Sequence, residues 1–139
     1  MPEPSIAVPP PPPDPLLTRA SVTFHTMDQD KDNNTFVEVK VRLMDQRTVV
    51  AKLSDFLGHF DENSDAGPFT LVMIHPAPRS QLRTGNVDIS AFQTLGRDTW
   101  RFNFVVDLLF DDGAHLLARA NGVRLKSSDN TVEQSFGIE

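Results

Sequence analysis

The chain has 139 residues, which is enough for one domain with a hydrophobic core and too few for two. Its net charge of −6 argues against a nucleic-acid partner and against constitutive binding to anionic lipid, because both require a clustered basic surface. The absence of cysteine excludes disulfides, thiolate catalysis and cysteine-zinc sites.

Proline dominates the start of the chain. Eight of the eleven prolines lie within the first fifteen residues, and Pro9 to Pro13 are consecutive. Consecutive prolines fix φ and supply no amide donors, so residues 1–19 are predicted to form a disordered, proline-rich arm ahead of a folded domain over residues 20–139. We interpret the arm as a spacer, with docking of Pro9 to Pro13 in an aromatic groove as the alternative.

The first residues also bear on localisation. The segment Met1-Pro2-Glu3-Pro4 has neither the basic nor the apolar region of a secretory signal. No stretch approaches the roughly 18 to 20 apolar residues that span a bilayer. We therefore expect a protein that is cytoplasmic or exported without a classical signal.

From residue 20 onward the hydrophobic pattern has a period of two. Trp100 to Phe110 shows it most clearly, and Val37 to Leu43 shows it again, since apolar side chains alternate there with polar ones. Six weaker candidates are Ser21–Thr26, Thr48–Leu53, Phe69–Ile74, Asn86–Phe92, His115–Lys126 and Thr131–Phe136. Short strands at this spacing predict an all-β fold, an antiparallel β-sandwich of about eight strands. Only Ser54 to Phe60 leaves room for a helical turn.

An alternating run of oxygen ligands separates the first two predicted strands. Asp28, Asp30 and Asp32 carry carboxylates at every second position, and Asn34 adds a neutral oxygen. Calcium binds six to eight oxygen donors, and a curled loop can turn such side chains toward one point. The run predicts a Ca²⁺ loop. The alternative is an ordinary polar turn, because Asp and Asn cap turns.

The order of the strands predicts which loops lie together. In an antiparallel sandwich, successive connections alternate between the two ends of the fold. Asp61, Asn63 and Asp65 in the third connection would then join the Asp28 run at one end, as would Asp98 and Asp129 in later connections. Asp45, the Arg79 to Arg83 stretch and the Asp111-Asp112 pair would lie at the other end. Carboxylates gathered at one end repel each other unless a cation lies among them.

The acidic loop does not follow the EF-hand pattern. Counting from Asp28, the sixth position is Asn33 instead of glycine and the twelfth is Val39 instead of glutamate. An Asp-rich loop between two strands, with Asp28, Asp30 and Asp32 as ligands and Asp61 and Asp65 as further candidates, resembles the calcium-binding β-sandwich domains of the synaptotagmin and protein kinase C type, or PLAT domains. That resemblance implies docking on membranes, but the loops at the acidic end of the predicted sandwich offer only Met27, Phe60 and Lys31 for such contacts.

Catalytic patterns are absent from the sequence. The four histidines are His25, His59, His75 and His115, and none is paired at the short spacing typical of zinc or iron sites. His59 lies beside Asp61, but a surface role is favoured over a ligand role. Asp112-Gly113 is a hairpin signal. Trp100, which begins the strongest apolar face, is predicted to be buried.

The sequence thus predicts a non-catalytic, calcium-binding β-sandwich module that supports adhesion or partner recognition. Its predicted metal ligands are Asp28, Asp30, Asp32, Asn34, Asp61, Asn63 and Asp65. Two alternatives remain open, a calcium-independent interaction or structural protein and a carbohydrate-binding module. A protein or carbohydrate partner fits these functions, and edge strands could also pair two chains as a homo-oligomer.

Overall fold

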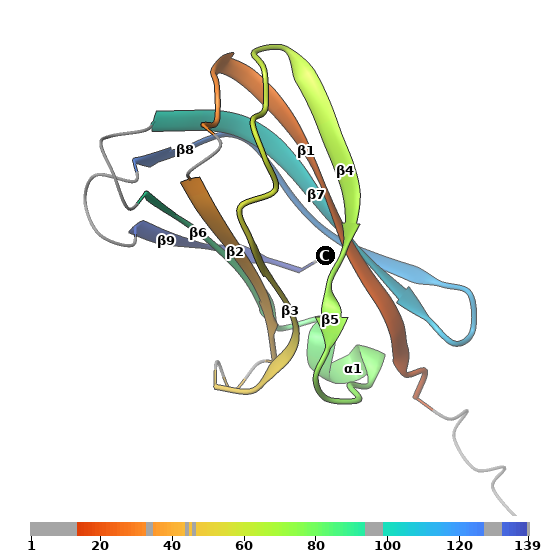
Figure 1. Ribbon diagram of the computed structural model, residues 1–139. Helices are drawn as coiled ribbons and strands as arrows, with labels where there is room; N and C mark the ends of the chain where they lie inside the picture. Colours follow the sequence, from red (N-terminus) through yellow and green to blue (C-terminus); the bar gives the residue numbers. More distant parts are fainter. Residues whose placement is uncertain are drawn as a thin grey trace, which may run out of the picture.

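The protein is a sandwich of two antiparallel β-sheets, which confirms the predicted fold (Figure 1). The computed structural model describes residues 14–32, 35–43, 45, 47–93, 99–126 and 132–138. One sheet has the strand order β4 (Ser64–Thr70), β1 (Leu17–Gln29), β7 (Thr99–Phe110) and β8 (His115–Lys126). The other has the order β5 (Val72–Met73), β3 (Val49–Asp55), β2 (Thr35–Arg42), β6 (Asn86–Gln93) and β9 (Val132–Gly137).

Alternating side chains fill the space between the sheets. In β7, Trp100 and every second residue after it as far as Phe110 are buried, as the period of two predicts. Aromatic rings dominate one end of this core, where Phe24 lies 5.0 Å from Trp100 between ring centroids. The indole Nε1 of Trp100 donates a buried hydrogen bond of 3.1 Å to Thr26 Oγ1, so the polar atom of this large side chain is paired.

Three predicted elements were wrong. The stretch from residue 61 to residue 68, predicted as a loop, contains most of β4, which pairs with β1. The chain then bends at Leu71 and changes sheets to form β5, so the predicted strand Phe69–Ile74 is divided between two strands. The single helix of the described residues is α1 (Arg79–Leu82), whereas residues 56–60 of the predicted helical turn have no helical structure.

Strand β1 begins earlier than the predicted domain boundary at residue 20. Its first residue is Leu17, whose backbone N–H donates to Ala77 O at 2.8 Å, and its side chain is buried. Residues 1–13 of the predicted proline arm lie outside the described residues.

Two of the three connections predicted to share the second end do meet there. Arg79 of α1 pairs with Asp112 of the β7–β8 turn at 2.8 Å. Gly113 follows Asp112 with a positive φ of 83°, so this turn forms at the expected Asp-Gly step. None of the helices in the described ranges is long and apolar enough to cross a membrane.

Candidate metal site

The candidate site lies where the segment after β1 meets the segment before β4. Lys31 and Phe60 form a two-residue β-bridge, in which Lys31 N–H donates to Phe60 O at 3.1 Å and Phe60 N–H donates to Lys31 O at 3.0 Å. This bridge fixes the two segments side by side. It therefore joins the first acidic loop to the third connection, as the strand order predicts.

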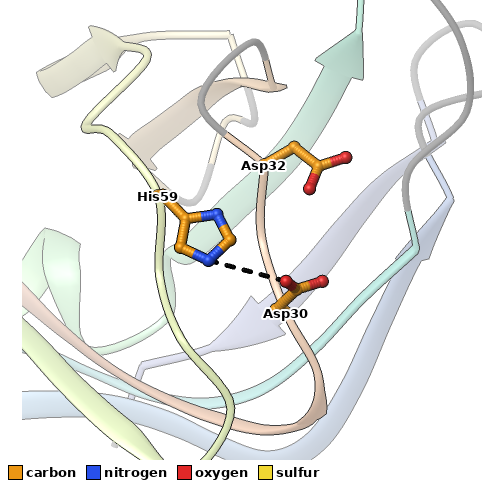
Figure 2. A group of neighbouring side chains, drawn as sticks. All are labelled: Asp30, Asp32 and His59. Carbon is orange, nitrogen blue, oxygen red and sulfur yellow. Dashed lines mark ion pairs between the residues drawn. The ribbon is translucent and has the colours of Figure 1, made fainter.

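Extended backbone on both segments sends alternate side chains to opposite sides. Lys31 and Phe60 are buried, whereas their neighbours Asp30, Asp32 and His59 retain contact with solvent. Figure 2 shows both aspartates on one segment and the imidazole of His59 on the segment that faces it. By pairing the two segments, the Lys31–Phe60 bridge brings Asp30, Asp32 and His59 together in a small cluster.

The three side chains are close enough to share one ion. One ligand atom from each of Asp30, Asp32 and His59 lies within 4.8 Å of the others. His59 Nε2 is 3.5 Å from Asp30 Oδ2, the contact drawn in Figure 2, and 2.9 Å from Asp61 Oδ1. His59 Nε2 therefore lies close to two carboxylates. A metal ion could bind between these three groups.

Behind the cluster, the Lys31 side chain is fully buried among carbonyl groups. Its ammonium donates to the backbone oxygens of Phe56 and Gly58, each at 2.5 Å, and to that of Asp32 at 3.1 Å. Nζ also lies 4.9 Å from the centre of the Phe60 ring, within the range of a cation–π contact. A positive charge is thereby built into this end of the sandwich, within hydrogen-bond distance of the backbone of Asp32.

The other predicted ligands that the structure describes have different contacts. Asp28 lies 3.2 Å from the Arg101 guanidinium, and Asp65 Oδ1 lies 2.7 Å from His25 Nδ1. Asn63 occupies a turn with a positive φ of 56°, and its N–H donates to Met27 O. None of these three belongs to the Asp30–Asp32–His59 group. Asn34, Asp98 and Asp129 lie outside the described residues.

Sequence reasoning assigned His59 a surface role and so missed its place in the cluster. The available signal was its spacing, since His59 and Asp61 stand at i and i+2, and an extended segment puts such residues on one side. The residue between them, Phe60, is apolar and buried, as an inward-facing neighbour should be.

Comparison with known proteins adds no relative: no family model, curated protein or solved structure matches the chain. Two carboxylates and one imidazole on a half-exposed surface can hold a divalent cation and leave coordination positions open to water or to another molecule.

Proposed function

We propose that the protein is a non-catalytic binding module that holds a divalent cation through Asp30, Asp32 and His59. This proposal rests on the distances between one ligand atom of each residue, since these three atoms all lie within 4.8 Å of one another. Asp61, which contacts the same His59 nitrogen, is the fourth candidate ligand. With three or four protein ligands at the surface, the ion has open positions that a carboxylate or hydroxyl of a partner can fill, which suits adhesion or recognition.

The donor set bears on the identity of the metal. The sequence predicts Ca²⁺ because all of its predicted ligands are oxygen donors, and Ca²⁺ binds oxygen ligands almost exclusively. An imidazole together with carboxylates suits Zn²⁺ or Mn²⁺ better, since imidazole is a preferred ligand of first-row transition metals. We therefore propose a mixed nitrogen–oxygen site that prefers Zn²⁺ or Mn²⁺ to Ca²⁺.

The test is thermal unfolding of the full chain in EDTA and in excess Zn²⁺, Mn²⁺, Ca²⁺ or Mg²⁺. An ion at a hundred times its dissociation constant stabilises the native state by about 2.7 kcal/mol, which raises the melting temperature by several degrees. Asp30→Asn and His59→Gln should each abolish the rise. Asp107→Asn is the matched control, because that carboxylate pairs with His115 at 2.6 Å and belongs to neither the cluster nor the predicted ligands.

Each outcome is informative about the ligands. A rise with Zn²⁺ or Mn²⁺ that both variants lose supports the mixed site. A rise with Ca²⁺ alone that survives His59→Gln would replace it with an all-oxygen site, as the sequence predicted. No rise with any of the four ions would overturn the proposal.

One observation favours a second candidate, an interaction module that needs no metal. The buried ammonium of Lys31 already binds carbonyl groups of the loop that carries the cluster, so an internal cation can hold this end together. The exposed apolar side chains of Val72, Met73 and Ile74 on and beside edge strand β5 then offer a contact surface. Stability that does not change with EDTA or added metal would favour this candidate.

A further inference from the structure

A second polar site lies on the outer face of the β4-β1-β7-β8 sheet. A hollow of about 430 Å³ opens there, and its side chains come from all four strands. This volume lies within the range of small-molecule sites in proteins, about 300 to 1,000 Å³. The residues involved are not those of the candidate metal site.

The hollow is built on two adjacent rows of cross-strand neighbours. In one row, Thr23 of β1 lies opposite Val105 of β7, which lies opposite Arg119 of β8. In the next row, Asp65 of β4 lies opposite His25, which lies opposite Asn103. Neighbouring strands are about 4.8 Å apart, so polar groups are spread over roughly 14 Å from β4 to β8.

A bulge on each side bends the sheet around these rows. In β8, Asn121 and Gly122 together face the single residue Asn103, and Gly122 N–H donates to Asn103 Oδ1 at 2.8 Å. Gly122 has a positive φ of 67°, a conformation that glycine adopts without strain. The pairing of β1 with β4 also shifts beside Thr23. Strands β1, β4 and β7 curve together along this sheet (Figure 1). Bulges redirect side chains and are frequent beside binding sites.

The chemical groups at the two ends of the hollow differ. At the β8 end, Arg119 is exposed, and among the described residues no carboxylate lies within ion-pair distance of it. Its guanidinium can therefore receive a carboxylate through two parallel hydrogen bonds. At the β4 end, Asp65 accepts from His25 and keeps further lone pairs for hydroxyl donors. Between them, Val105 gives a small apolar floor that is 39% exposed.

We propose that this hollow binds an acidic saccharide, with a uronate carboxylate at Arg119 and sugar hydroxyls at Asn103, Asn121 and Asp65. The amides of Asn103 and Asn121 suit hydroxyl groups because each amide both donates and accepts. The span from β4 to β8 fits a disaccharide better than a single ring. This site is independent of the metal proposed above, and binding is expected to be unchanged in EDTA.

The experiment is a titration of the ¹⁵N-labelled full chain with digalacturonate, followed by amide chemical shifts in EDTA. We expect saturable shifts at Val105, Arg119 and Asn121. Cellobiose, which lacks the carboxylate, and acetate, which lacks the hydroxyls, should both bind more weakly than digalacturonate. Arg119→Gln should weaken digalacturonate binding by about tenfold or more, because a hydrogen-bonded charge pair is lost.

The matched control is Arg124→Gln, an exposed arginine of the same strand that does not line the hollow. It should bind digalacturonate as the wild type does. The proposal is overturned if digalacturonate gives no saturable shifts, or if Arg119→Gln binds it as tightly as the wild type. Equal binding of acetate and digalacturonate would also overturn it, because the hollow would then recognise a bare carboxylate.

Discussion

The Lys31 ammonium lies 4.9 Å from the centre of the Phe60 ring, and the backbones of the same two residues exchange both of their hydrogen bonds. One pair of residues thus joins two loops through the main chain and through the side chains. The cation is fully buried and is held by three carbonyl oxygens. Lys31 therefore organises the end of the sandwich that carries the Asp30–Asp32–His59 cluster.

Replacing Lys31 tests this role. Lys31→Met keeps most of the side-chain volume but leaves three part-buried carbonyl groups without their donor, so we expect the free energy of unfolding to fall by about 3 kcal/mol. Urea denaturation followed by circular dichroism measures the change. Lys40→Met is the control, since Lys40 pairs with Glu38 at 2.8 Å near the surface. This substitution should lower the free energy of unfolding by at most about 1 kcal/mol. Equal losses in the two variants would contradict the organising role.

The buried contact between Trp100 and Thr26 gives a second prediction. Thr26→Val leaves the indole N–H without its acceptor in a site closed to water, at an expected cost of about 1 to 3 kcal/mol. The same substitution in a Trp100→Phe background should cost less, because the donor is then absent. Thr23→Val, on the outward side of the same strand, is the control.

Denaturation of the four proteins gives the coupling between Thr26 and Trp100 as a double-mutant cycle. Trp100 is the only tryptophan, so its fluorescence reports on its own surroundings in the variants that retain it. A coupling energy near zero would mean that the hydrogen bond contributes nothing to stability.

The sequence predicted the sandwich because alternation is a local property of each strand. It could not predict β4, whose segment contains Gly67 and Pro68 and so resembles a turn. Proline has no amide hydrogen to donate, and it is tolerated here because β4 lies at the edge of its sheet. Knowing that a strand lies at an edge requires the whole topology, which the local pattern does not contain.

The candidate site was predicted in part for the same reason. Asp30 and Asp32 could be singled out because alternation puts them on one side of their segment. That Asp28 would pair with Arg101, and Asp65 with His25, depends on cross-strand register. The proximity of His59 to Asp30 and Asp32 depends on the Lys31–Phe60 bridge. Long-range register of this kind has no signal in a single sequence.

Gly67 marks a close approach between β4 and β1. Its φ is 111°, and a Cβ atom there would lie 2.7 Å from Val22 O, a backbone atom that cannot move aside. We expect Gly67→Ala to lower the free energy of unfolding by about 2 to 3 kcal/mol. Gly137→Ala is the control, because nothing lies within 4 Å of its added Cβ. Urea denaturation distinguishes the two, and equal stability would show that the bulge relaxes without cost.

The Glu38 carboxylate lies on the face of β2 turned away from the core. Partial burial alone would raise its pKa, but hydrogen bonds from Lys40 and Ser54 and the charges of Lys40 and Lys52 together hold the pKa below the ordinary value of 4.5. The folded state therefore binds the Glu38 proton less readily than the unfolded chain does. Its contribution to stability is complete above pH 4.5 and is lost as the pH falls through the lowered folded pKa.

The carboxyl ¹³C chemical shift of Glu38, followed against pH, measures this directly. The midpoint in the wild type should lie below 4.5, and Lys40→Met should raise it, because both a hydrogen bond and a positive charge are removed. In urea denaturation, Glu38→Gln should lose less stability than the wild type between pH 5 and pH 3, since it has no proton to gain there. A wild-type titration midpoint at or above pH 4.5 would show that burial raises the pKa of Glu38 by at least as much as the neighbouring groups lower it.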